Sequence, residues 1–164
     1  MAVTAAPLRR LPLMAAFPLA MSLPAAAEQE PYGQTMTGWR FTQDIVNGRA
    51  VCRAYSPDPT AGVIIQRRGD GQFFMSVPVR NVPQGRYEEA SFEVGRTAEP
   101  VNATADGNRV YLAVDDHLIA LAVPAGGFRW AVNGRRQVGT VQFNMAFGPA
   151  IDRLRQCTRA NGGR

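Results

Sequence analysis

The sequence predicts a mainly β fold, an antiparallel β-sandwich or barrel of about seven or eight short strands with a C-terminal helix tethered by a disulfide. Short segments with a two-residue hydrophobic period recur along the chain, and turn dipeptides such as Asn-Gly and Asp-Gly separate them. A three-residue hydrophobic period marks the last helix. We expect one domain over residues 38–160, preceded by a flexible lead-in over residues 28–37.

The first strands are predicted over residues 39–42 and 49–55, joined by a turn at Asn47-Gly48. A hairpin follows, with β-rich arms over 63–68 and 72–79 on either side of Gly69-Asp70-Gly71. In its second arm Phe73, Met75, Val77 and Val79 alternate with other residues, which places them on one face.

The second half predicts strands over 91–94, 109–114, 128–132 and 137–145. Val138 is out of phase beside Gly139, which suggests a bulge in the last strand.

Two helices are expected in this half. Asp115 and Asp116 stand at an N-cap position before a short helix over 115–123, although the same residues would also suit a continuing strand. Pro149 suits the first position of a terminal helix that runs to about Arg159.

The N-terminus has the three parts of a secretory signal peptide, which we assign to residues 1–27. Arg9 and Arg10 precede an apolar segment over 11–24, and Ala25-Ala26-Ala27 supplies the small residues of a cleavage site after Ala27. The apolar segment is shorter than the roughly 20 residues that span a bilayer. We therefore expect a periplasmic or secreted protein with no stable membrane insertion after cleavage.

The two cysteines, Cys52 and Cys157, are expected to form a structural disulfide, because an even count in an exported protein favours one. Cys-x-x-Cys spacing, which a redox-active pair would need, is absent, and two cysteines with one histidine do not complete a zinc site without carboxylates. We predict no metal and no cofactor.

All 18 basic residues are arginines, and the net charge is +5. The guanidinium group suits phosphates and carboxylates, although codon usage in a GC-rich genome would also explain the absence of lysine. Arg67, Arg68, Arg135 and Arg136 adjoin predicted turns and are the candidate contacts for an anion or partner, with ordinary solvated turn charges as the alternative. Nucleic acid is disfavoured, because the chain carries an export signal and its charges are dispersed.

His117 is the only histidine, and its neighbours Asp115 and Asp116 suggest either an acid–base pair or simply the start of a helix. Asp106 with these two acids would offer oxygen ligands to calcium, but the EF-hand spacing is missing. The tripeptide Arg68-Gly69-Asp70 matches an integrin-binding sequence, yet a tight hairpin turn alone explains it.

Several aromatic residues suggest a sugar platform, although core packing is the alternative, above all for Trp130. They are Tyr32, Trp39, Tyr55, Tyr87 and Trp130.

The order of features along the chain is informative as well. A signal peptide is followed by the strand Trp39-Arg40-Phe41 and the early Cys52, and the chain closes with a strand, Phe147-Gly148 and a helix that contains Cys157. In outline over residues 38–158, this layout resembles the invasion-associated locus B family of α-proteobacterial envelope proteins. The resemblance implies a periplasmic or surface β-sandwich without enzymatic activity.

The leading hypothesis is a non-enzymatic binding or interaction domain of the bacterial envelope, whose partner is an envelope protein or an anionic envelope polymer. The alternative is an inhibitor of an envelope-directed hydrolase, either a lysozyme or a protease, that inserts the 69–71 turn or a loop over residues 100–108. An enzyme dependent on His117 is the third hypothesis.

Overall fold

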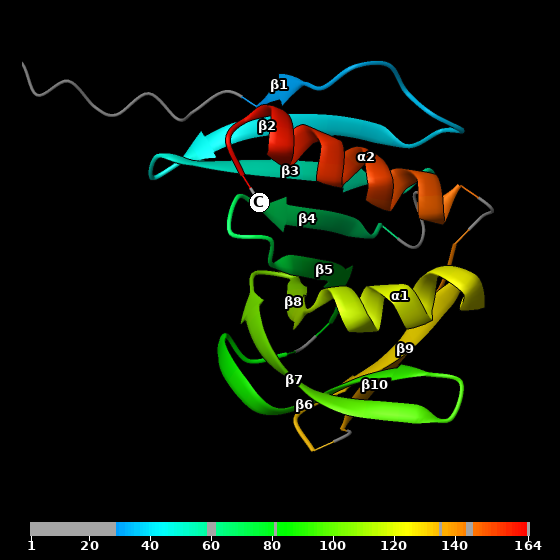
Figure 1. Ribbon diagram of the computed structural model, residues 1–164. Helices are drawn as coiled ribbons and strands as arrows, with labels where there is room; N and C mark the ends of the chain where they lie inside the picture. Colours follow the sequence, from blue (N-terminus) through cyan, green and yellow to red (C-terminus); the bar gives the residue numbers. More distant parts are fainter. Residues whose placement is uncertain (1–28, 59–61, 81, 135, 144–145, 164) are drawn as a thin grey trace, which may run out of the picture.

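The computed structural model describes residues 29–58, 62–80, 82–134, 136–143 and 146–163, and the predicted signal peptide lies outside these ranges. In this part of the chain, ten antiparallel strands form one open sheet (Figure 1). The strands are β1 (Glu30–Pro31), β2 (Arg40–Val46), β3 (Arg49–Tyr55), β4 (Ile64–Arg68), β5 (Phe73–Pro78), β6 (Gly85–Val94), β7 (Thr97–Asp106), β8 (Arg109–Val114), β9 (Gly127–Val132) and β10 (Gln137–Gln142).

The order across the sheet is β1-β2-β3-β4-β5-β8-β7-β6-β9-β10. The chain builds the first half by successive hairpins up to β5. The next strand, β6, lies three positions away from β5 in the sheet. The chain then returns toward β5 through β7, and β8 pairs with β5. After crossing the sheet it adds β9 and β10 beyond β6.

Two helices, α1 (Asp116–Ala125) and α2 (Phe147–Ala160), cover one face of the sheet (Figure 1). Helix α1 contacts β6 and β9, and helix α2 contacts β3 and β4. We call the covered side the inner face and the other side the outer face. The sheet curls around the helices, so that the ring of Trp39 before β2 lies 5.6 Å from the ring of Phe143 after β10.

The hydrophobic core lies between the inner face and the helices. Its largest fully buried side chains are Trp39, Ile65, Phe73, Met75, Phe92, Leu112, Ile119, Phe147, Ile151 and Leu154. Because side chains alternate along a strand, the residues between the inner ones point to the outer face, which carries many polar side chains.

The prediction of a mainly β fold with a C-terminal helix tethered by a disulfide is confirmed. The described strands number ten rather than seven or eight, and they form one open sheet rather than a sandwich or barrel. The reason is that two helices, not a second sheet, cover the apolar face of the strands. Within the expected flexible lead-in, β1 pairs with β2.

The structure corrects the expected loop over residues 100–108. Most of this segment belongs to β7, in which Val101, Ala103 and Ala105 are buried and alternate with exposed residues. The pattern was hidden because alanine and proline are uncommon in strands. Pro100 is accommodated because β8 pairs only with the later part of β7, from Ala103 onward.

The predicted bulge at Val138 and Gly139 is also wrong, because β9 and β10 pair without a register shift. Gly139 lies opposite Trp130, and a Cβ atom there would stand 2.6 Å from the indole ring. Position 139 therefore requires glycine because the Trp130 ring packs directly against it, and the glycine does not interrupt the pairing of β9 with β10. The register shift of this half lies instead between Tyr87 and Ala90, where β6 pairs with β7.

Both predicted helices are present. The side chain of Asp115 accepts a hydrogen bond from the backbone N–H of Leu118 and caps α1, which runs through Pro124 and ends at Gly126 in the left-handed conformation. Helix α2 begins two residues before Pro149, so the proline occupies the first turn rather than the first position. Neither described helix is long and apolar enough to cross a membrane.

Candidate anion-binding surface

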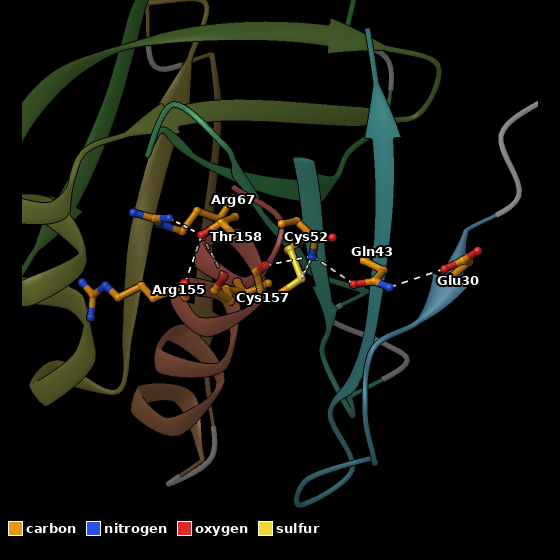
Figure 2. The surroundings of a disulfide bond; sticks show 9 residues. Glu30, Gln43, Cys52, Arg67, Arg155, Cys157 and Thr158 are labelled. Carbon is orange, nitrogen blue, oxygen red and sulfur yellow. Dashed lines mark hydrogen bonds between the residues drawn. A yellow bond between two sulfur atoms is a disulfide. The ribbon is translucent and has the colours of Figure 1, made fainter. Parts of the chain in front are cut away.

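The Cys52–Cys157 disulfide joins the centre of β3 to the last turns of α2, with a Cα–Cα distance of 6.1 Å (Figure 2). Hydrogen bonds next to the disulfide also join the end of α2 to β2. The Asn161 amide donates to Gln43 Oε1 at 3.0 Å and to the Cys157 carbonyl at 2.9 Å. The bond therefore fixes the C-terminal helix over the first half of the sheet.

The structure corrects the expectation for Arg67, which is not an exposed contact. It is only 6% exposed, points to the inner face and donates a hydrogen bond to Thr158 Oγ1 on α2 (Figure 2). Its guanidinium also lies 5.3 Å from the centre of the Phe73 ring. Burial lowers the pKa of Arg67, and the nearby Arg155 and Arg159 lower it further, against the opposing charge of Asp116. Arg67 therefore packs helix to sheet.

Arg68 points the other way and is exposed on the outer face, 4.1 Å above the centre of the Phe74 ring. Arg136 is also exposed, but it lies in the turn between β9 and β10, at the other end of the sheet. Arg135 lies outside the described residues. The structure therefore does not bring Arg67, Arg68 and Arg136 into one patch.

A different set of arginines converges on the outer face of β2, β3 and β4. Arg49, Arg53 and Arg68 line a groove of about 500 Å³ there. Its other lining residues are Val46, Asn47, Val51, Gln66 and Asp70. We call these eight residues the arginine groove. Because α1 and α2 lie on the inner face, neither helix covers it.

Strand geometry explains why these arginines meet. Cys52 points inward to the disulfide, so Arg53 points outward, and Arg49 shares its face at a spacing of four residues. In the ladder, Gln66 pairs with Arg53 and Arg68 pairs with Val51, which brings the three guanidinium groups onto adjacent strands. Neither Arg49 nor Arg53 adjoins a second arginine in the sequence, so the pattern of adjacent arginine pairs does not identify them. The alternation of Ala50, Cys52 and Ala54 with outward residues is the signal that identifies them.

The carboxylates near the groove leave much of this positive charge uncompensated by hydrogen bonds. Arg49 Nη1 lies 3.7 Å from Asp70 Oδ2, and both side chains are exposed. Arg53 Nη1 lies 3.6 Å from Asp44 Oδ2, beyond a hydrogen bond, and this buried nitrogen has no hydrogen-bond partner. The exposed guanidinium groups of Arg49 and Arg68 are thus the donors that an anion would reach first, with Arg53 behind them.

Each residue of the Asp115-Asp116-His117 segment makes a hydrogen bond or an ion pair with another part of the protein. Asp115 caps α1, Asp116 accepts a hydrogen bond from Arg155 at 2.7 Å, and His117 Nε2 lies 3.5 Å from Glu99 Oε1. Desolvation would lower the pKa of Arg155, but its hydrogen bonds to Asp116 and Asp152 outweigh that effect and the pKa is raised. These contacts favour the interpretation of the segment as a helix start.

The Arg68-Gly69-Asp70 tripeptide lies at the β4–β5 turn, as predicted, but it is held from several sides. The Gly69 N–H donates to the Ala50 carbonyl at 2.8 Å, and Asp70 Oδ1 accepts from the Gln72 N–H at 3.0 Å. Of the two loops considered for an inhibitor, only this turn remains, since residues 100–106 belong to β7.

The five aromatic residues considered as a sugar platform do not share one surface. Trp39 and Trp130 are buried in the core, whereas Tyr32, Tyr55 and Tyr87 are partly exposed in separate places. Among the described residues no group of three or more His, Cys, Asp or Glu side chains gathers to hold a metal ion.

No protein-family model matches the chain, and no curated protein or solved structure matches it. The chemistry of the candidate site therefore rests on the residues themselves. Of the described side chains that line the arginine groove, none is a serine, cysteine or histidine. The set of three arginines with Gln66 and Asn47 suits the binding of an anion through charge-assisted hydrogen bonds.

Proposed function

We propose that this protein is an exported, non-enzymatic binding domain of the bacterial envelope, and that the arginine groove holds phosphate or carboxylate groups of an anionic envelope polymer. The single observation that carries the proposal is the convergence of Arg49, Arg53 and Arg68 on a groove that neither helix covers. Each guanidinium offers a planar fork of donors that matches the oxygens of both groups.

The exposed ion pair of the groove leaves room for such a ligand. An exposed pair such as Arg49–Asp70 contributes only about 0–1 kcal/mol, because solvent screens it and both side chains lose freedom. A polymer with repeated anionic groups would contact several arginines at once and would displace water rather than a strong internal bond.

Export is supported by the N-terminal sequence pattern and by the disulfide, which persists in oxidising compartments. The layout that resembles the invasion-associated locus B family supports the same location. An enzymatic role has no comparable support, because its candidate residue His117 lies at the exposed start of α1 and does not line the arginine groove.

Two pairs of exposed arginines permit a matched test. The chain, purified with its disulfide intact, is applied to beads that carry peptidoglycan and to beads that carry inorganic polyphosphate. We expect Arg49→Gln with Arg68→Gln to weaken binding to the preferred beads by about tenfold or more, since charge-assisted hydrogen bonds are lost. Arg129→Gln with Arg136→Gln removes the same charge elsewhere and should leave binding within about twofold.

Equal losses in the two double variants would show that net charge, not the groove, attracts the polymer. No binding of the unmodified chain to either bead would overturn the polymer as the ligand of the arginine groove. Binding should also weaken as salt is added, because exposed charges are screened.

A further inference from the structure

We propose that the arginine groove and the adjoining apolar tip of the β2–β3 hairpin form a surface for anionic lipid membranes, with Ile45 and Val46 entering the bilayer interface beside the bound headgroups. This inference rests on the anion-binding role of the arginine groove in the proposed function, and it assigns the anionic headgroups of a membrane surface to the groove in place of a polymer.

The apolar tip is unusual within the described part of the chain. Only three large hydrophobic side chains there are markedly exposed: Ile45 at 54%, Val46 at 40% and Val138 at 54%. Two of the three are consecutive and stand at the end of β2, whereas Val138 lies in β10 at the opposite edge of the sheet. Clustered exposed apolar residues mark interaction sites more often than single ones do.

The tip is joined directly to the arginine groove. Val46 pairs with Arg49 across the hairpin and lines the groove together with Arg53 and Arg68. Because successive side chains of a strand point to opposite faces, Ile45 projects on the other side of the same tip. The hairpin therefore presents an apolar side chain on each face, with arginines immediately behind one of them.

The turn makes this tip well defined. Asn47 and Gly48 have φ values of 51° and 73°, as a two-residue hairpin turn with two left-handed residues requires. Nothing lies within 4 Å of the position where a Cβ of Gly48 would stand, so the turn projects into open space. A short, ordered projection loses little conformational freedom when it enters an interface.

Apolar and basic residues together favour a membrane over a soluble polymer. A polymer of sugars and phosphates supplies anions for the arginines but no apolar layer for Ile45 and Val46. Stable membrane attachment generally takes two signals, and here buried apolar surface would supply one and attraction to anionic headgroups the other.

Co-sedimentation with lipid vesicles tests the inference. The unmodified chain with its disulfide intact is mixed with vesicles of phosphatidylcholine and with equimolar phosphatidylglycerol–phosphatidylcholine vesicles. We expect binding only to the anionic vesicles. Ile45→Ser with Val46→Ser should reduce that binding by about tenfold or more, because two apolar side chains no longer enter the interface.

Val138→Ser is the matched control, since Val138 is as exposed as Ile45 but lies away from the groove. It should bind the anionic vesicles within about twofold of the unmodified chain. A urea unfolding curve of each variant checks that the chain still folds, as expected for serine at exposed positions.

The outcomes separate this inference from the proposed function. Undiminished vesicle binding by the Ile45→Ser, Val46→Ser variant, or binding to peptidoglycan or polyphosphate beads with none to anionic vesicles, would overturn the lipid inference and leave the anion-binding function standing. An unmodified chain that binds neither beads nor vesicles would overturn both. Equal binding to both vesicle types would overturn the role of the arginines.

Discussion

Residues 40–78, which contain β2 to β5, carry five arginines and three aspartates, whereas residues 85–106, which contain β6 and β7, carry two arginines and five acidic residues. Both regions bury one side against a helix, α2 in the first case and α1 in the second (Figure 1). The two regions thus share a way of packing and differ in the charge that they present to solvent.

The difference teaches how this protein separates stability from binding. The inner side chains and the disulfide hold the helices to the sheet, and the outer side chains are free to carry charge. Substitutions of side chains on the inner face should therefore alter the free energy of unfolding. Substitutions of exposed side chains on the outer face should alter binding with little effect on folding.

The largest effect should come from the disulfide, which only the first region has. Cys52→Ser with Cys157→Ser opens a loop with a sequence separation of 105 and should lower the free energy of unfolding by about 4–5 kcal/mol in the chain-entropy model. Urea unfolding measures the loss. Hydrogen exchange should show α2 and β3 losing more protection than β6 and β7, and a uniform loss would contradict the division into two regions.

A cavity under α2 should have the next largest effect. Leu154 is fully buried between α2 and the sheet, so Leu154→Ala should lower the free energy of unfolding by about 3 kcal/mol. Gln156→Ala changes an exposed residue of the same helix and should shift it by less than about 0.5 kcal/mol. Similar unfolding curves for the two variants would show that this part of the helix is not packed as described.

The comparison also shows which features the sequence can predict. The β4–β5 hairpin was predictable because Phe73, Met75 and Val77 alternate in its second arm, directly after a turn of specific chemistry. The start of α1 was predictable because Asp115 is a common capping residue placed before an apolar period. These are local signals, which a sequence displays directly.

The failures arise where a property depends on which face a residue occupies. Arg67 and Arg68 are adjacent in sequence, yet in a strand they point to opposite faces, so one packs against α2 and the other lines the groove. Arg49 and Arg53 join Arg68 only through the pairing of β3 with β4, which is a non-local property. The predicted number of strands was too low at β7, because small residues weaken the alternating pattern, and at the two-residue β1, which is too short to show one.

The second region depends on a helix cap instead of a disulfide. Asp115→Ala removes the acceptor for the Leu118 N–H and should lower the free energy of unfolding by about 1 kcal/mol. Asp106→Ala, at an exposed position of β7, is the control and should change it by less than about 0.5 kcal/mol. Thermal unfolding resolves the difference, and an equal effect of both variants would show that the cap does not stabilise α1.

The smallest effect should come from the acidic residues of β6, which repel an anion in the arginine groove from a distance. Glu88 and Glu89 are exposed on β6 and do not line the arginine groove. Glu88→Gln with Glu89→Gln should strengthen binding to anionic vesicles or polyphosphate beads by about twofold at low salt, since repulsion of the anion is reduced and screening limits its range. The gain should vanish at high salt. An increase as large as the loss in Arg49→Gln with Arg68→Gln would mean that overall charge, rather than the arginines on one face of β3 and β4, determines where the anion binds.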